Sequence, residues 1–127
     1  MPQVVIVIAV ALLQYLFFGM LVGRARMQYK VEAPATTGHP VFERYNRVHQ
    51  NTQESLIMFL PGMTMFGFYA SANVACLLGV VWIVGRIIYL RSYLKDPASR
   101  GLGAMLSFIP NIILVVGGAI AAGMLLL

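Results

Sequence analysis

The sequence predicts an all-α integral membrane protein, a four-transmembrane-helix bundle built from one domain that covers residues 1–127. Two observations carry this prediction. The chain is 60% hydrophobic and only 10% charged, with a mean hydropathy of +0.82, a composition typical of membrane proteins. Three windows without a charged residue, 1–23, 55–85 and 101–127, each exceed the roughly 20 apolar residues that span a bilayer.

The first window predicts a helix from about Val4 to Val22. A signal peptide is the alternative, but no basic segment precedes the apolar run, so a retained span is favoured. Its polar residue Gln14 is expected to bond a neighbouring helix. The segment from Gly23 to Val41 contains three prolines or glycines near its end and predicts an irregular cytosolic loop, in which His39 is a solvated residue.

The middle window decides the number of spans. As one straight helix it would reach about 46 Å, whereas a hydrocarbon core measures about 30 Å. Two spans fit if the polar residues outside the window belong to the helices and the small, polar stretch Tyr69–Asn73 forms the turn. The second helix is therefore expected from Val41 or Phe42 to Tyr69, with a kink at Pro61. The third is expected over residues 74–93.

A short loop over residues 94–100 leads to the fourth helix, predicted from Gly101 to Leu127. This helix has no charge, and its Gly117-Gly118 pair favours close approach to a neighbour. Cys76 is the single cysteine and is expected to be a small core residue, so that a disulfide within the chain and a cysteine-based metal site are both excluded. No metal is expected.

The positive charges orient the bundle. All nine Lys and Arg residues lie within residues 24–47 and 86–100, and four spans place both segments on one side, as the positive-inside rule requires for the cytosol. The net charge of +5 then reflects orientation and contact with anionic membrane lipid, and nucleic-acid binding is not expected. The short loops favour a bacterial inner membrane or an endoplasmic-reticulum-like membrane.

A polar block over residues 43–54 precedes the apolar half of the second helix. Helical spacing places Arg47, Asn51 and Glu54 on one face of that helix. Arg86 and two tyrosines share one face at the cytosolic end of the third helix, at the same membrane level, and Arg100 follows in the next loop. This set suits a small zwitterionic ligand with carboxylates and an ammonium group.

The alternative is that these residues only pair with one another at the membrane edge, for example in a salt bridge between Glu54 and Arg86. The lengths of the spans place both side chains toward the membrane interior. Ionisable groups there cost free energy and usually have a function. A binding site is therefore favoured.

Three motifs resemble a known family: Glu-Arg-Tyr-Asn-Arg-Val-His-Gln-Asn-Thr-Gln-Glu over residues 43–54, Val-Trp-Ile-Val-Gly-Arg-Ile-Ile-Tyr-Leu-Arg-Ser-Tyr over 81–93, and Asp-Pro-Ala-Ser-Arg-Gly over 96–101. Their order and wording are similar to the MAPEG superfamily, the membrane-associated proteins in eicosanoid and glutathione metabolism, and most similar to its microsomal glutathione S-transferase branch. The resemblance implies a homotrimer of four-helix protomers that binds glutathione, as co-substrate, in a cytosol-facing site between subunits. The residues that the resemblance implies in binding are Arg26, Arg47, Asn51, Glu54, Tyr89 and Tyr93. Arg86 is added to this set because it belongs to the polar face of the third helix.

The resemblance also implies the activity. Arg100 matches an arginine beside the glutathione thiol, and Tyr93 could donate a hydrogen bond to the same sulfur, so both are candidate catalytic residues. The expected reaction is conjugation of the thiolate to lipophilic electrophiles, a detoxification, with glutathione-dependent peroxidase activity on lipid hydroperoxides as a further reaction. One position departs from the pattern, because Ser55 stands where related synthases have a tyrosine. Glu43 and His49 are expected to be structural.

Two other functions fit this length and hydropathy. The first is a non-catalytic lipid-binding or scaffold member of the superfamily, which the presence of Arg100 disfavours because that branch is expected to lack the thiol-activating arginine. The second is a small four-helix transporter. Proton-coupled transport needs an ionisable group deep in a span, and the nearest candidate, Glu54, lies at a helix edge.

Overall fold

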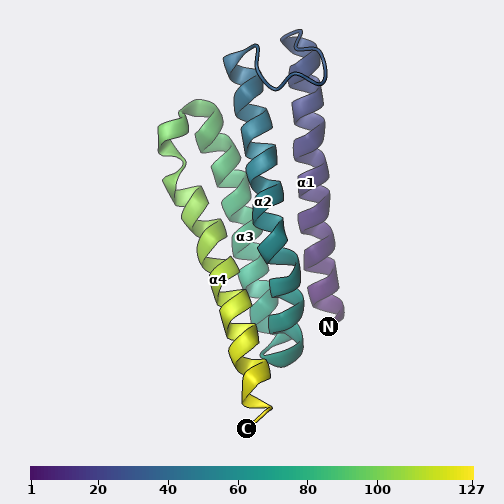
Figure 1. Cartoon of the computed structure of the whole chain (residues 1–127), viewed down its shortest axis with the longest axis vertical. Helices are drawn as coiled ribbons and strands as arrows, with labels where there is room; N and C mark the ends of the chain where they lie inside the picture. Colours follow the sequence, from purple (N-terminus) through teal and green to yellow (C-terminus); the bar gives the residue numbers. More distant parts are fainter.

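The computed structural model describes residues 1–127 and contains four long helices (Figure 1). They are α1 (Pro2–Gln28), α2 (Pro40–Tyr69), α3 (Ala72–Lys95) and α4 (Gly101–Met124), with a short 3-10 helix, η1 (Pro97–Ser99), before the last. Helix α1, helix α3 and the segment formed by η1 and α4 are long and apolar enough to cross a membrane. Helix α2 has the polar block in its first half and an apolar second half. The predicted all-α membrane bundle is confirmed.

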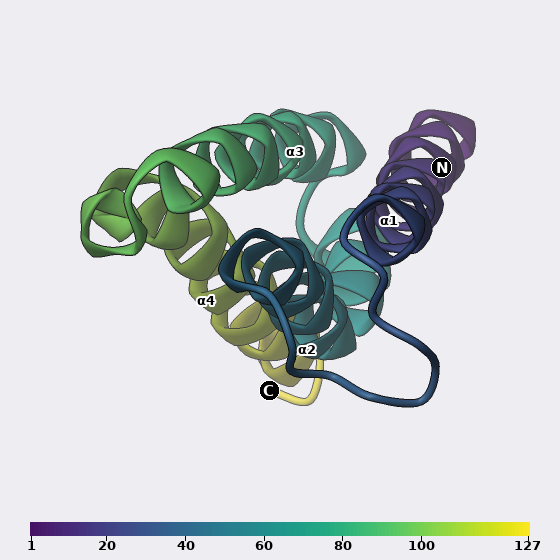
Figure 2. The ribbon, with the colours of Figure 1, turned by 90° about the horizontal axis from the view of Figure 1, so that it is seen from above.

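The helices run alternately up and down, so both chain termini lie at one end of the bundle and the α1–α2 and α3–α4 connections lie at the other (Figure 1). Ala70 and Ser71 form the turn between α2 and α3, within the predicted turn. Both basic segments therefore meet at the end opposite the termini. Seen along the bundle, α1 and α4 lie on opposite sides of the pair α2 and α3 (Figure 2), and each packs against both of them.

The main core lies between the apolar halves of α1, α2 and α3. Phe59 and Met63 of α2 and Trp82 of α3 are fully buried there, and the Phe59 and Trp82 rings stack with their centroids 4.2 Å apart. Half-buried Cys76 packs against this core. Large apolar side chains such as Leu13 remain exposed on the outer surfaces, as expected for helices that face lipid.

Helix α1 is longer than predicted, because it continues to Gln28 instead of ending near Val22. Arg, Ala, Met and Gln are good helix formers, and a single glycine is too weak a breaker to stop the helix at Gly23. The irregular loop is correspondingly shorter. His39 is half-buried at the end of this loop and is not freely solvated: its Nδ1 accepts a hydrogen bond from Val41 N (3.1 Å), and its ring stacks on Tyr29. His39 caps α2, and Pro40 occupies the first helical position, which suits its fixed φ.

Two expected contacts between helices are confirmed. The Gln14 side-chain Nε2 donates to the Ile83 carbonyl of α3 at 2.9 Å. Gly118 of α4 lies directly against the backbone of Met65 and Phe66 on α2. Helix α2 continues unbroken through Pro61, and the kink expected at that position stays a prediction.

Gly103 allows α4 to pack directly against the backbone of α3. A Cβ atom at this position would lie 2.5 Å from the backbone nitrogen of Tyr89. We expect Gly103→Ala to lower the free energy of unfolding by about 1–3 kcal/mol, because the two backbones must separate. Thermal unfolding in detergent micelles measures the effect. Gly123→Ala is the matched control on the same helix, since nothing lies within 4 Å of its Cβ; equal stability of the two variants would contradict this account.

Candidate functional site

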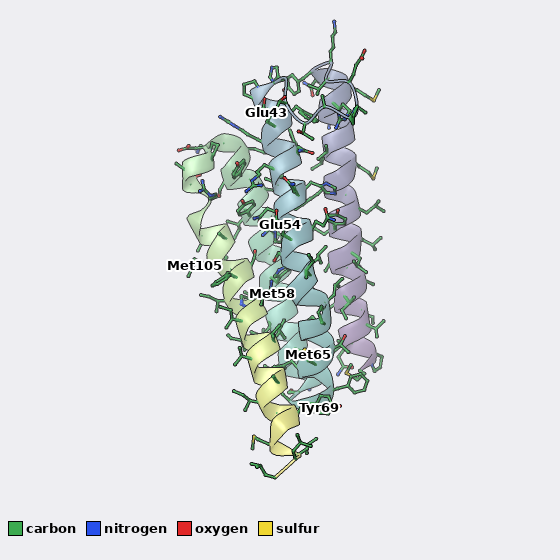
Figure 3. All side chains as sticks on the ribbon, in the orientation of Figure 1. Glu43, Glu54, Met58, Met65, Tyr69 and Met105 are labelled. Atoms are coloured by element: carbon green, nitrogen blue, oxygen red, sulfur yellow. The ribbon has the colours of Figure 1, made fainter.

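A cavity of about 400 Å³ opens between α2, α3 and α4, and we call it the inner cavity. It combines polar side chains with an apolar wall made by Met58, Met105 and Phe108. Figure 3 shows Glu54 and Met58 one turn apart on α2, with Met105 on the neighbouring α4. Five of the predicted site residues line this one cavity: Asn51, Glu54, Arg86, Tyr89 and Arg100.

Arg86 lines the inner cavity, joins the three helices around it and is only 1% exposed. Its Nη2 donates to Asn51 Oδ1 (2.8 Å) and Thr52 Oγ1 (3.0 Å) on α2, and its Nη1 donates to Ser107 Oγ (3.3 Å) on α4. Its guanidinium carbon also lies 4.4 Å from the centre of the Tyr89 ring. The two polar faces therefore meet as predicted. Arg86 is bonded to Asn51 and not to Glu54. All three of its hydrogen-bond acceptors are therefore neutral.

Helix α4 contributes polar residues that the sequence analysis did not assign to the site. Ser107 and Asn111 are both buried and line the inner cavity. Asn111 Nδ2 donates to Ser55 O (3.1 Å) and Ser55 Oγ (3.0 Å), which ties α4 to α2. The sequence does contain a signal for these two residues, because they are polar, four positions apart and on one face of an otherwise apolar span.

A second, more polar pocket of about 480 Å³ lies beside the first part of α2, and we call it the outer pocket. Arg47 and Tyr93 line it. The two sites are neighbours, because Arg47 is one turn from Asn51 and the Tyr93 ring stacks on the Tyr89 ring, with 5.6 Å between their centres. Within the chain, the predicted site thus divides into an inner part and an outer part.

Arg100 and Tyr93 line different pockets. Arg100 is exposed, precedes the first residue of α4, and donates from Nη1 to Pro97 O at 2.8 Å. Because free backbone N–H groups at a helix start carry partial positive charge, α4 adds to the positive potential around this guanidinium. The structure therefore places a cation at the rim of the inner cavity. The prediction that Arg100 and Tyr93 both lie beside the same sulfur atom stays a prediction.

Arg26 lines neither pocket. Its Nη1 donates to Ala35 O (2.8 Å), and its guanidinium stacks on Phe42, so within the chain it fastens the α1–α2 loop. Its predicted contact with a ligand stays a prediction. Glu43 accepts a hydrogen bond from Gly38 N (3.2 Å), and His49 stacks on Tyr15 of α1, which are structural contacts.

Known proteins resemble this chain over most of its length. The model of the MAPEG family matches residues 4–120. An uncharacterized protein of Synechocystis sp. is 42% identical over 91% of this chain and 85% of its own length. Human microsomal glutathione S-transferase 2 is 40% identical over 74% of this chain and 64% of its own length, slightly less than two thirds. Leukotriene C4 synthase of Cavia porcellus is 34% identical over 66% of this chain and 56% of its own length.

Proposed function

Because the chain belongs to the MAPEG family, we propose that it is a membrane-bound glutathione transferase that conjugates glutathione to lipophilic electrophiles. The observation that carries the proposal is the charge of the inner cavity. Two guanidiniums, Arg86 and Arg100, and one carboxylate, Glu54, line it beside apolar side chains. Such a cavity favours an anionic, partly zwitterionic ligand that reacts with an apolar one. The relatives named as glutathione S-transferases support the same reaction.

The chemistry requires a thiolate. A free thiol has a pKa of about 8.5 and is mostly protonated at neutral pH, so a nearby cation favours the nucleophilic form. Arg100 is proposed for this role, because a guanidinium stays charged and cannot take the proton, which passes to water or to the substrate. Tyr93 is proposed as a hydrogen-bond donor to the sulfur. The thiolate then forms a bond to carbon as the leaving group departs with its electron pair.

The remaining residues are proposed to hold the tripeptide. Glu54 binds the ammonium group, while Arg47 in the outer pocket binds a carboxylate. Asn51 and Tyr89 supply hydrogen bonds, and Arg86 fixes the orientation of the Asn51 amide through its 2.8 Å bond. The same thiolate is proposed to attack the terminal oxygen of lipid hydroperoxides, which enter, like the electrophiles, from the surrounding lipid. An S–O bond forms as the O–O bond breaks and the lipid alcohol leaves, and a second glutathione then reduces the sulfenic acid to give glutathione disulfide and water.

We propose that the protein is a homotrimer with this site facing the cytosol. Glu54 and Arg100 are exposed in the single chain, which leaves room for a neighbouring subunit to close the cavity. The basic end of the bundle supports the orientation. Native mass spectrometry of the detergent-purified protein would give three copies per particle, and a monomer would contradict the assembly.

The binding role of Glu54 gives a direct test. We expect Glu54→Gln to bind glutathione about 10-fold more weakly, because a charge-assisted hydrogen bond to the ammonium group is lost. Isothermal titration of the purified protein measures the affinity. Glu32→Gln, which removes a carboxylate from an exposed loop position, is the matched control. The absence of glutathione binding by the unaltered protein would contradict the proposed function.

A further inference from the structure

The hydroxyl of Ser55 has an unusual hydrogen-bond arrangement. Its Oγ accepts from Trp82 Nε1 on α3 at 2.9 Å and from Asn111 Nδ2 on α4 at 3.0 Å. Both partners are donors by necessity. The indole nitrogen can only donate, and the Asn111 atom also lies 3.1 Å from the Ser55 carbonyl oxygen, which can only accept. Both lone pairs of the Ser55 hydroxyl are therefore occupied.

The hydrogen of that hydroxyl remains available. Other hydroxyls in these helices donate to the carbonyl four residues earlier: Thr52 to Val48 and Ser107 to Gly103. Ser55 makes no such bond, although this is the ordinary arrangement for a helical hydroxyl. Its side chain is half-buried and lines the inner cavity. The O–H is thus oriented by two neighbouring helices and is left to donate to a ligand atom.

We propose that Ser55 is a catalytic hydrogen-bond donor to the second substrate, and that this substrate is a lipophilic α,β-unsaturated carbonyl compound. The proposal rests on the proposed transferase function. A hydroxyl with both lone pairs occupied requires an acceptor, and two N–H groups on its oxygen polarise the O–H and strengthen its donation. The carbonyl oxygen of the substrate is such an acceptor. Its alkyl chain fits beside Met58, Met105 and Phe108.

The reaction is a conjugate addition. The glutathione sulfur attacks the β-carbon, a C–S bond forms, and the C=C electron pair moves so that negative charge develops on the carbonyl oxygen. The Ser55 O–H, which Trp82 and Asn111 hold in place, stabilises this enolate by hydrogen bonding and keeps its proton, because an alkyl hydroxyl is a weaker acid than an enol. Water then protonates the α-carbon, and the carbonyl group re-forms. Ser55 therefore acts on electrophiles whose oxygen gains charge in the transition state.

The experiment compares two electrophiles on the full-length protein with saturating glutathione: a long-chain 2-alkenal and benzyl chloride, which has no oxygen acceptor. We expect Ser55→Ala to lower kcat/KM about 100-fold for the alkenal and less than about 3-fold for benzyl chloride. Thr64→Val is the matched control, because its hydroxyl donates to Leu60 O on the same helix outside the cavity. It should change neither rate.

Ser55→Ala leaves the Trp82 indole N–H without an acceptor and removes one of the two acceptors of Asn111 Nδ2, and could fail to fold, so two further variants complete the test. Ser55→Thr keeps the hydroxyl and should retain the alkenal rate. Ser55→Cys has nearly the same size but a weak donor, and should show the selective loss. Equal losses on both electrophiles, or no loss with Ser55→Cys, would overturn the proposal. Turnover of benzyl chloride without turnover of the alkenal would also overturn it and leave the transferase function standing, whereas turnover of neither electrophile would refute both.

Discussion

Arg100→Ala is expected to abolish the conjugation reaction while glutathione still binds. Loss of the guanidinium removes the positive charge that favours thiolate, and removal of one such electrostatic contact typically lowers kcat by about 100- to 1,000-fold. Stopped-flow ultraviolet spectroscopy on mixing with glutathione reports thiolate formation directly, and turnover of benzyl chloride reports the reaction. Glutathione affinity should change far less than either signal, because the binding role is assigned to other residues.

The controls separate this role from a general effect of charge. Lys95→Ala removes an exposed cation at the end of α3, outside both pockets, and should retain thiolate formation. Arg100→Lys keeps the charge on a differently shaped group and should retain part of the activity. Full activity of Arg100→Ala would refute the role proposed for Arg100. Absence of thiolate formation in the unaltered protein would instead favour the non-catalytic, lipid-binding alternative.

Arg86→Ala is expected to lower the free energy of unfolding by about 2–4 kcal/mol. The change leaves a cavity at the meeting point of three helices and removes the donor to Asn51 Oδ1. Arg86→Met fills the volume and removes a buried charge that has only neutral partners, so its loss should stay below about 1.5 kcal/mol. Trp82, one turn away on α3, provides the fluorescence signal for thermal unfolding in micelles.

A binding measurement completes the test of Arg86. Arg86→Met should bind glutathione more weakly than the unaltered protein, because the Asn51 amide is free to turn. Arg91→Ala removes an exposed arginine five residues later on the same helix, and should change stability by less than about 0.5 kcal/mol. If Arg86→Ala were as stable as Arg91→Ala, the three-helix connection would have no energetic role.

Much of the fold follows from the amino-acid sequence alone. Windows without charge identify the spans, because a charged side chain is costly in hydrocarbon. The length of the middle window forces a hairpin, and the two basic segments assign both connections to one end, which the structure confirms. The boundary of α1 was missed by several residues, since Arg24 and Arg26 are compatible with both helix and loop and no strong breaker stands between them.

Part of the inner cavity's lining was predictable from the sequence, but the contacts between its side chains were not. Helical periodicity determines which residues share a face of one helix, so the sequence by itself determined that Asn51 and Glu54 lie on one face of α2. Periodicity does not determine the rotation and relative height of neighbouring helices, which depend on contacts such as Gly103 against Tyr89. Only the tertiary structure decided that Arg86 bonds Asn51 instead of Glu54, and that Trp82 and Asn111 converge on Ser55 and leave its hydrogen free.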